Sequence, residues 1–330
     1  MMNKVIVTGG CGFIGSALCE VLLNKGYKVI NIDSLTYAGY LKNTDQFHNH
    51  QNYTFYQLNI NDKKIKQILE EQKPLYIINC AAETHVDNSI KDPRKFVETN
   101  VNNTFDFLLT CMNYWQSKIA PNQFKFIQVS TDEVFGSLDK TGTFNELSQI
   151  NPSSPYSSSK AASDFLALSL FKTYKFPVVV TNCSNNFGPR QHHEKLIPTI
   201  MKKLIRDQKV PIYGDGKNVR DWIYVYDHVD ALISICKLGA CGERYCIGGN
   251  SEKSNLELVQ LILKSFNDYF KKSKSLNETI EFVTDRPGHD FRYAINNSKI
   301  NKKTKWTPSS NFSEKLLNTI LYYIETVKNE

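Results

Sequence analysis

Short apolar runs and longer amphipathic segments alternate along the first half of the chain. The apolar runs predict strands near 4–8, 28–32, 53–58, 75–80, 124–130 and 177–183. Segments with apolar positions at helical spacing predict helices near 13–25, 62–72, 92–115 and 156–174. Strands that alternate with helices in this way favour an α/β fold with a doubly wound parallel sheet.

The pattern becomes mixed in the second half. Helices are predicted near 195–206, 227–238, 254–270 and 312–328, with short strands and loops between them. A chain of 330 residues can bury a large core and is long enough for two lobes. We therefore expect a smaller, mixed C-terminal lobe beside the sheet.

Three glycines mark the first strand-to-helix turn. Gly9, Gly12 and Gly15 stand between the first strand and the first helix, as a dinucleotide-binding turn requires. Such glycines let the backbone approach a pyrophosphate, which then faces the helix N-terminus. Asp33 ends the second strand, where a carboxylate can bond both ribose hydroxyls and would repel a 2′-phosphate. The pattern favours NAD over NADP, and a glycine turn of some other α/β protein is the alternative.

Two adjacent carboxylates, Asp132 and Glu133, follow the apolar run 124–129. Neighbouring like charges push up one of the two pKa values. A site that needs one proton donor and one proton acceptor would gain from that arrangement. An acidic turn that caps the next segment is the alternative.

Tyr156 and Lys160 lie four residues apart at the start of the predicted helix 156–174, so their side chains share one face. An ammonium group beside a phenol favours the phenolate and would lower the tyrosine pKa from its usual value of about 10. The same spacing occurs on many amphipathic helices, so the pair is not diagnostic alone.

The order of these motifs resembles the extended short-chain dehydrogenase/reductase superfamily. The resemblance rests on the glycine turn, Asp33, Ala81-Ala82-Glu83, the STDEVFG segment from Ser130 and the YSSSK segment from Tyr156. Within that superfamily the chain is similar to nucleotide-sugar 4,6-dehydratases from about residue 4 to 295. Further likeness lies at 33–39, 81–87, 182–189, 194–198, 213–216, 220–222 and 285–290. STDEVFG is the specific part, because the related 4-epimerases lack the acidic pair.

The resemblance implies an NAD-dependent lyase that converts dTDP-glucose or UDP-glucose to the 4-keto-6-deoxy sugar nucleotide. In that scheme Tyr156, assisted by Lys160, takes the 4-hydroxyl proton while Thr131 bonds the same oxygen. Glu133 then removes the C5 proton, and protonated Asp132 delivers a proton to the departing 6-hydroxyl. The C4 hydride moves to NAD and returns at C6. A 4-epimerase that has no use for the acidic pair and a non-catalytic NAD-binding protein are the alternatives.

The resemblance also implies the binding residues. Those expected to hold NAD are Gly9, Gly12, Phe13, Ile14, Gly15, Asp33, Leu35, Thr36, Asn59, Ile60, Ala81, Ala82, Glu83, Asn100, Ser130, Tyr156, Lys160 and Cys183. Those expected around the nucleotide sugar are Thr84, His85, Asp87, Asn185, Asn186, Glu194, Lys195, Leu196, Tyr213, Arg220, Asn255, Arg286 and His289. Asn59 stands where many relatives carry an acidic residue, and an ion pair of Arg220 with Asp221 or Asp215 is an alternative to phosphate binding.

By the same resemblance, residues 1–183 with about 225–248 form an NAD-binding domain, and 184–224 with 249–330 form a nucleotide-sugar lobe. The helices at 92–115 and 156–174 resemble those of a homodimer interface, although they could equally be covered within one chain.

Composition and charge limit the partners, the compartment and the metals that we expect. The net charge of +7 comes with lysine clusters near 271–274 and 299–305, which are typical of a solvated face, so we expect no nucleic-acid partner. No apolar stretch reaches the roughly twenty residues of a membrane span, and the N-terminus does not resemble a signal peptide. The eight cysteines are scattered without a C-x-x-C pair, which favours reduced thiols and a cytoplasmic protein. His192-His193 has no third ligand placed by spacing, so no metal is predicted.

Overall fold

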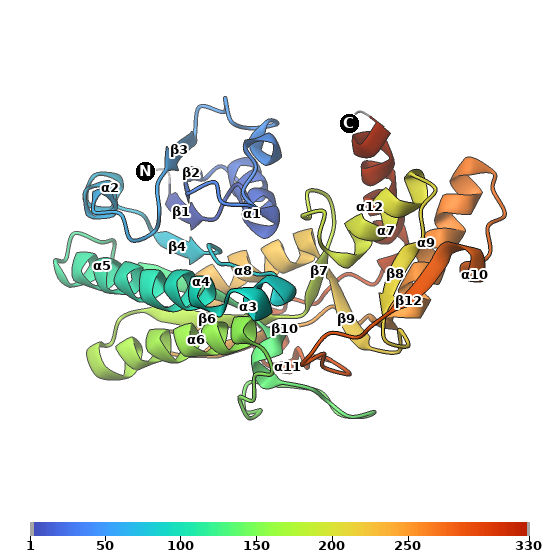
Figure 1. Ribbon diagram of the computed structural model, residues 1–330. Coiled ribbons are helices and arrows are strands. Elements are labelled where there is room, and N and C mark those ends of the chain that lie inside the picture. Colours follow the sequence, from blue (N-terminus) through green and yellow to red (C-terminus); the bar gives the residue numbers. More distant parts are fainter. Residues whose placement is uncertain (1–2, 329–330) are drawn as a thin grey trace.

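A seven-stranded parallel sheet forms the centre of the computed structural model, which describes residues 3–328 (Figure 1). The strand order is β10-β6-β5-β4-β1-β2-β3. The strands are β1 Lys4–Thr8, β2 Lys28–Asp33, β3 Tyr53–Gln57, β4 Tyr76–Asn79, β5 Lys125–Thr131, β6 Val178–Cys183 and β10 Arg244–Ile247. All neighbouring strands are parallel, so the chain must cross over the sheet between them, and the crossovers are mostly helical.

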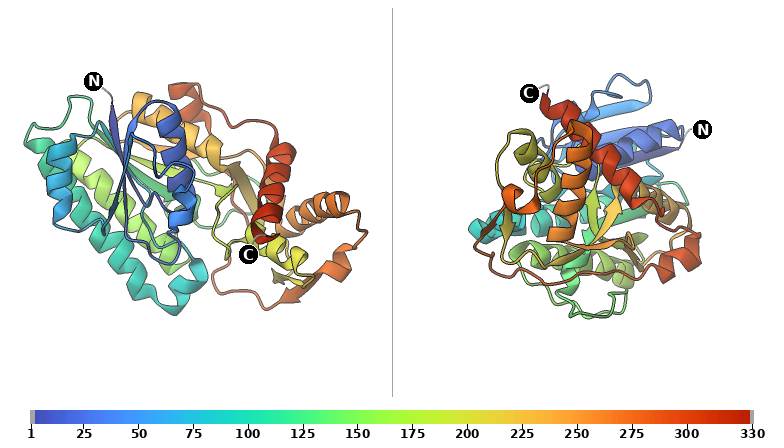
Figure 2. Two further views of the ribbon diagram at one scale, coloured as in Figure 1. Left: turned by 90° about the horizontal axis from the view of Figure 1, so that it is seen from above. Right: turned by 90° about the vertical axis from the view of Figure 1, so that its right-hand side faces the viewer.

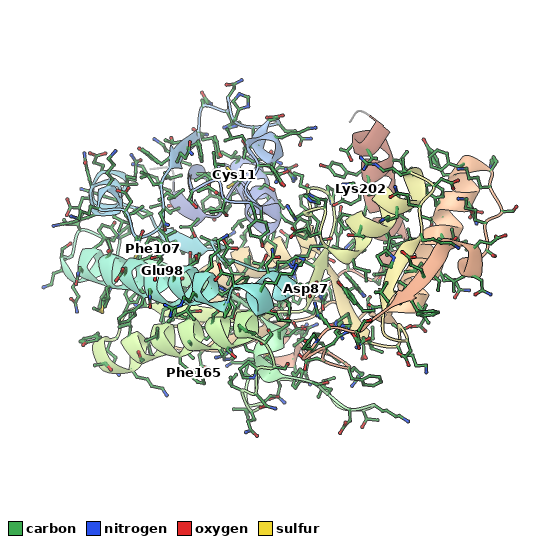
Figure 3. The ribbon with its side chains drawn as sticks, viewed as in Figure 1. Cys11, Asp87, Glu98, Phe107, Phe165 and Lys202 are labelled. Carbon is green, nitrogen blue, oxygen red and sulfur yellow. The ribbon has the colours of Figure 1, made fainter. Side chains whose placement is uncertain are left out.

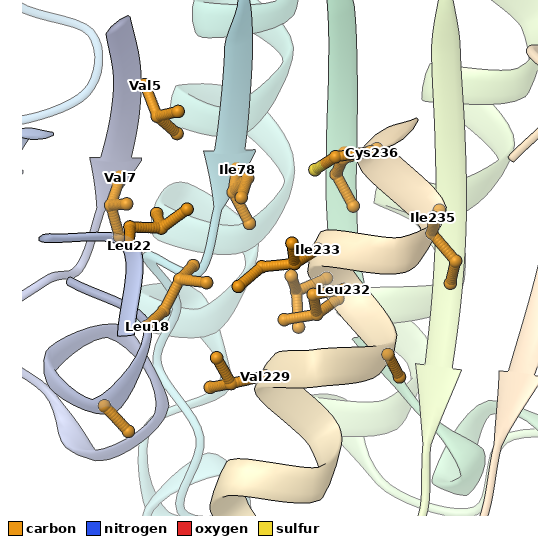
Figure 4. Packing of buried hydrophobic residues seen from close by; sticks show 14 of the residues in the cluster. Val5, Val7, Leu18, Leu22, Ile78, Val229, Leu232, Ile233, Ile235 and Cys236 are labelled. Atoms are coloured by element: carbon orange, nitrogen blue, oxygen red, sulfur yellow. The ribbon is translucent and has the colours of Figure 1, made fainter. Parts of the chain in front are cut away.

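Helices cover both faces of this sheet. Helices α1 Phe13–Asn24 and α8 Val225–Leu238 lie on one face, where they pack against Val5 and Val7 of β1 (Figure 4). The other face carries α2 Lys64–Gln72, α5 Thr104–Gln116 and α6 Pro155–Tyr174, which pack against Ile6 of the same strand. Successive strand residues point to opposite faces, which explains why the apolar runs are continuous. The predicted doubly wound α/β fold is confirmed.

The predicted helix 92–115 is found, with a π-helical segment in its middle. It consists of α4 Pro93–Val97, the π-helical segment η2 Glu98–Asn103 and α5, and a separate helix, α3 Val86–Lys91, precedes it. Pro93 has no backbone N–H and stands at the first turn of α4, while Asp92 caps that helix by accepting from the Lys95 amide. A new helix therefore starts at Pro93 instead of continuing from α3.

The later part of the chain builds a second group of elements beside the sheet (Figure 2). Its three-stranded sheet has the order β11-β9-β7, and its two-stranded sheet pairs β12 with β8. The strands are β7 Asn185–Phe187, β8 Val210–Tyr213, β9 Val219–Tyr224, β11 Glu252–Ser254 and β12 Ile280–Val283. Its helices are α7 Leu196–Ile205, α9 Asn255–Phe270, α10 Leu276–Thr279 and α12 Phe312–Lys328. Helix α11 Ser298–Thr304 instead packs against α8 and β10 of the large sheet. A separate apolar core joins α7, α9 and α12.

The carboxyl ends of the parallel strands meet at one edge of the large sheet, and this edge carries the motifs. The glycine turn follows β1, Asp33 ends β2, Thr131 ends β5 and Cys183 ends β6. Two short 3-10 helices, η1 Leu41–Thr44 and η3 Asp132–Phe135, lie in the loops that leave this side. Ligands of such folds bind at this edge. Within residues 3–328, no helix is long and apolar enough to cross a membrane.

Candidate active site

A cavity of about 330 Å³ lies at this edge, between the large sheet and the segment 183–196. Most of the predicted site residues line it. They are Gly9, Gly12, Phe13, Ile14, Gly15, Asp33, Thr36, Asn59, Ile60, Ala81, Ala82, Glu83, Thr84, Ser130, Thr131, Asp132, Glu133, Tyr156, Lys160, Cys183, Asn185, Asn186, Lys195 and Leu196. The volume is within the range of small-molecule and cofactor sites.

The glycine turn has the geometry that a dinucleotide needs. Gly9 has a φ of +68°, and a Cβ at this position would lie 2.9 Å from the backbone nitrogen of Ala81. A Cβ at Gly15 would collide with the carbonyl oxygen of Gly9. Gly12 caps α1 without a side-chain hydrogen bond, so the first backbone N–H groups of α1 remain available to an anion. The turn therefore fits the pyrophosphate of a dinucleotide.

Asp33 is buried at the end of β2 and faces the cavity. Its Oδ2 accepts from the Cys11 backbone N–H (2.9 Å) and its Oδ1 from the Leu35 N–H (2.8 Å). Burial raises the pKa of Asp33, and these two hydrogen bonds lower it. Each oxygen retains a lone pair that could accept from a ribose hydroxyl.

Tyr156 and Lys160 lie on α6 and are both buried. The Lys160 Nζ donates to the carbonyl oxygen of Val129 at 2.8 Å. Burial lowers the pKa of Lys160, and the carboxylate of Asp164 raises it. The two predicted partners therefore share a face and the cavity.

The expected lowering of the Tyr156 pKa is not found in the protein alone. Burial and the neighbouring charge of Glu133 raise this pKa well above its usual value. Only a hydrogen bond with the Thr131 side chain has a prominent lowering effect. The reason is that desolvation penalises the phenolate more than the neighbouring groups favour it.

Asp132 and Glu133 lie in η3, directly after β5, where the Thr131 hydroxyl caps the turn by accepting from the Glu133 N–H (3.2 Å). Asp132 is only 1% exposed. Its Oδ1 accepts weakly from the Thr131 hydroxyl (3.3 Å), whereas its Oδ2 has no hydrogen-bond partner among the described residues. A buried carboxyl oxygen without a hydrogen-bond partner favours the neutral acid over the charged carboxylate.

The surroundings separate the two carboxyl groups. Burial, Glu133 and Asp221 raise the pKa of Asp132 well above its usual value. Burial also raises the pKa of Glu133, but three cations oppose this effect, namely Arg286, Lys195 and Arg220. Asp132 is thus poised to hold a proton while Glu133 is the better candidate for the charged form, which is how a site obtains one acid and one base.

Cations reach the cavity from the second group of elements. Lys195 donates to the Thr84 carbonyl (2.9 Å), and Arg286 lies 3.5 Å from Asp87. Asp87 also accepts from the Tyr213 hydroxyl (3.2 Å), and it lies at the junction of the two groups of elements (Figure 3). The Nε of Arg286 is buried without a partner among the described residues. A buried donor of this kind could bind an anionic ligand.

Arg220 forms neither of the ion pairs considered from the sequence. Its terminal nitrogens donate to the carbonyls of Val219 (2.8 Å), Asp290 (2.9 Å) and Phe291 (3.3 Å). Its guanidinium also lies 4.3 Å from the centre of the Tyr293 ring. Asp221 instead accepts from the backbone of Gly249 and Ser251, and Asp215 pairs with Lys217. Arg220 therefore acts on the acidic pair mainly through its charge.

Several predicted residues lie outside the cavity lining. Asn100 accepts from the Glu83 N–H (2.9 Å) and donates to the Glu83 carbonyl and the Ser159 hydroxyl. It therefore fixes the backbone of Glu83, which lines the cavity. The remaining ones are Leu35, His85, Asp87, Glu194, Tyr213, Arg220, Asn255, Arg286 and His289.

Other lining residues were not predicted, among them Ser34, Gly39, Thr99, Gln191, His192 and Trp222. Gly39 had a local signal, because it is a glycine close to Asp33 in sequence. In the structure, a Cβ there would lie 2.8 Å from Oδ1 of Asp33. The other five residues reach the cavity only through tertiary packing.

The fold and this site define a dinucleotide-binding enzyme of the extended short-chain dehydrogenase/reductase class. The family model for GDP-mannose 4,6 dehydratase matches residues 6–319, and the chain belongs to this family. It is 44% identical over 326 residues to a probable dTDP-glucose 4,6-dehydratase of Sinorhizobium fredii, covering 98% of this chain and 93% of the relative. The predicted resemblance to nucleotide-sugar 4,6-dehydratases is confirmed.

Solved structures agree with this assignment. A dTDP-glucose 4,6-dehydratase of Bacillus anthracis in complex with NAD is 42% identical, with a TM-score of 0.87 and coverage of 99% of this chain and 98% of that one. A dTDP-glucose 4,6-dehydratase of Streptomyces venezuelae with NAD bound is 36% identical, with a TM-score of 0.89 and 98% coverage of both chains. A UDP-glucuronic acid 4-epimerase of Bacillus cereus is 26% identical, with a TM-score of 0.87 and coverage of 98% of this chain and 99% of that one. The fold alone therefore does not separate dehydratases from epimerases.

Proposed function

We propose that the protein is an NAD-dependent hydro-lyase that converts dTDP-glucose to the 4-keto-6-deoxy sugar nucleotide. The observation that carries this proposal is the acidic pair in the cavity, where Asp132 favours the neutral acid and nearby cations oppose the rise that burial causes in the pKa of Glu133. Dehydration requires both forms in one step, since a base must take the C5 proton while an acid protonates the leaving hydroxyl. The reaction class and the cofactor expected from the sequence are confirmed by the dehydratase relatives.

The glycine turn and Asp33 are the residues that would hold NAD, through backbone N–H groups at the pyrophosphate and a carboxylate at the ribose. NAD held by these residues would supply a hydride acceptor for C4 of the sugar and a hydride donor for C6. The backbone of Cys80 and Ala81 leaves no room for a side chain at Gly9 on this wall of the cavity.

The protein's own groups move the protons. Tyr156 takes the 4-hydroxyl proton at its phenolic oxygen, while Thr131, which hydrogen-bonds Tyr156, orients the same hydroxyl. The resulting 4-ketone acidifies the C5 proton, which Glu133 removes. Asp132 then protonates the departing 6-hydroxyl, and Glu133 returns a proton to C5. Burial of Asp132 favours its protonated form because ionisation would leave a desolvated charge.

A 4-epimerase is the alternative with the same fold. It would share Tyr156, Lys160 and Thr131 and would gain nothing from the two adjacent carboxyl groups of Asp132 and Glu133. The cost of burying Asp132 with an oxygen that has no partner among the described residues argues for chemistry at this position.

Mass spectrometry of the products separates these functions. We expect incubation with dTDP-glucose to release a sugar nucleotide lighter by one water, and a parallel incubation with UDP-glucose to react more slowly. In deuterated water, one solvent deuterium should appear at C5, and hydrogen labelled at C4 should be recovered at C6. An unchanged product mass would refute the dehydratase, and faster reaction of UDP-glucose would refute the thymine preference.

The proposal also covers which parts of the chain bind NAD and which bind the nucleotide sugar, and the oligomeric state. We assign NAD binding to residues 1–183 with about 225–248, and nucleotide-sugar binding to 184–224 with 249–330. In support, β10 is a strand of the large sheet and α8 packs on that sheet, whereas Lys195 and Arg286 bring charge from the other group. We also propose a homodimer through the helices at 92–115 and 156–174, because Val97 and Phe165 on these helices expose 48% and 54% of their surface. Figure 3 marks Phe165 on α6.

A further inference from the structure

Three potential metal ligands converge at the mouth of the cavity. His192, His193 and Glu194 follow one another in the chain, and each offers a ligand atom within 4.8 Å of the other two. His192 lines the cavity, and His193 and Glu194 are exposed to solvent. Among the described residues, no other group of three histidine, cysteine or acidic side chains is this close together. The sequence alone did not reveal the convergence, because adjacent side chains usually point in different directions.

The distances fit a tetrahedral divalent cation. The Nδ1 atom of His192 lies 3.4 Å from Oε2 of Glu194. Zinc bonds to nitrogen and oxygen of about 2.0–2.2 Å place neighbouring ligands of a tetrahedron roughly 3.3–3.5 Å apart. The two atoms are therefore at the separation that one shared zinc ion would impose.

Only a weak hydrogen bond occupies the lone pair of the His192 ligand atom, and a metal would replace that bond. Its Nε2 is 2.9 Å from the Tyr40 hydroxyl, and its Nδ1 accepts weakly from the Glu194 backbone N–H (3.4 Å). With its proton on Nε2, the neutral ring points an acceptor nitrogen at a carboxylate oxygen. A cation between the two acceptors would relieve this contact. The Tyr40 contact would also orient the ring, as partners of metal-bound histidines do.

A second histidine lies near the same carboxylate. The Nε2 of His85 lies 3.6 Å from Oε2 of Glu194. The Nδ1 of His85 accepts from the Asn88 N–H, so the proton of the neutral ring is on Nε2. His85 therefore has no lone pair to offer on the side of Glu194 and is not a ligand.

We propose that His192, His193 and Glu194 form a zinc site at the cavity mouth, with water as the fourth ligand, and that zinc bound there inhibits the enzyme. Binding of the metal is independent of the proposed function, whereas inhibition rests on it. The ion would add a divalent charge beside Lys195 and would hold His192 and Glu194 in place at the entrance. Access of the nucleotide sugar would then compete with the metal.

The test uses the tag-free, full-length protein after removal of metal with a chelator. Calorimetric titration with Zn²⁺ should give one site per chain, and Co²⁺ should give the visible spectrum of a four-coordinate nitrogen and oxygen site. His193→Gln should weaken zinc binding at least about tenfold. The matched control is His48→Gln, which changes another exposed histidine and should leave zinc affinity unaltered.

Equal zinc affinity of the two variants would overturn the proposal, as would a six-coordinate Co²⁺ spectrum or a sulfur-to-cobalt band from a cysteine.

The dehydratase assay is the second readout. Zinc should inhibit the wild type and the His48→Gln control, and His193→Gln should keep normal activity and resist inhibition. If zinc binds as expected but no dehydration is seen without it, the metal site stands and the proposed function fails. Undiminished activity with the site filled overturns the inhibitory role.

Discussion

At the scale of single residues, burial decides which carboxyl group carries the proton. Asp132 and Glu133 are adjacent, yet Asp132 is 1% exposed with an oxygen that no described residue partners, whereas three cations act on Glu133. Such an arrangement costs stability, because an ionised Asp132 would be desolvated and beside a like charge. Functional sites commonly retain such costs.

The stability of Asp132→Asn relative to the wild type should increase as the pH rises. The folded state raises the pKa of Asp132 above the unfolded value of about 3.9, so the wild type loses stability as pH rises from there toward the folded-state pKa. Asparagine does not titrate. The difference in the free energy of unfolding between Asp132→Asn and the wild type should grow by up to about 1.4 kcal/mol per pH unit within that window. Calorimetric melting at a series of pH values tests this, and a gap that stays constant would contradict the raised pKa.

Lys195→Met should move the acid limb of the kcat profile to higher pH. The ammonium of Lys195 lowers the pKa of Glu133, and Glu133 must be ionised to take the C5 proton. Without that charge, a higher pH is needed to form the base. Lys195→Arg keeps the charge and is the control. The measurement is kcat against pH with saturating dTDP-glucose, and an unshifted limb in Lys195→Met would remove Glu133 as the base that sets it.

At the scale of elements, β5 connects the site to the rest of the sheet. Its last residue is Thr131, and its first, Lys125, holds the C-terminal end of α8. The buried Nζ of Lys125 donates to the carbonyls of Cys236 (2.8 Å) and Gly239 (2.7 Å), and to that of Ile235 (3.3 Å). A positive charge at a helix C-terminus also interacts favourably with the helix dipole.

Lys125→Met should therefore destabilise the protein by about 2–4 kcal/mol, because buried carbonyls lose their donor. Lys66→Met on α2 changes an exposed lysine and should alter stability by less than about 0.5 kcal/mol. Urea unfolding followed by fluorescence compares the two variants. Equal midpoints would mean that α8 does not depend on this contact.

At the scale of the whole molecule, the exposed apolar side chains are unevenly placed. Val97 of α4 and Phe165 of α6 lie on helices that pack together on one face of the large sheet. Leu238, at the end of α8, is similarly exposed at 52%, but it lies on the other face. Of these three residues, the first two belong to the proposed dimer surface.

Phe165→Glu should convert the dimer to a monomer, because the charge would be buried in the apolar interface. Sedimentation velocity should report about half the wild-type mass. Leu238→Glu introduces the same charge outside that surface and should leave the mass unchanged. A monomeric wild type, or a Phe165→Glu variant of unchanged mass, would refute the proposed interface.

The sequence by itself determined the parts whose chemistry lies in contiguous residues. The turn at Gly9 to Gly15, the carboxylate at Asp33 and the pair Asp132-Glu133 are all recognisable from the order of the residues. Each depends on a short segment at a strand end, and parallel strands bring such ends to one edge. The apolar runs predicted the sheet for the same reason, since both of its faces are buried.

Tertiary structure decided the partners and the burial of each group. Lys125 contacts carbonyls that follow it by 110 to 114 residues, and Arg220 bonds carbonyls near residue 290 in place of a neighbouring aspartate. Burial reversed the expected shift of the Tyr156 pKa, and side-chain directions brought His192 toward Glu194. Hydrogen bonds and desolvation depend on distances between atoms, and those distances are set only when distant segments pack together.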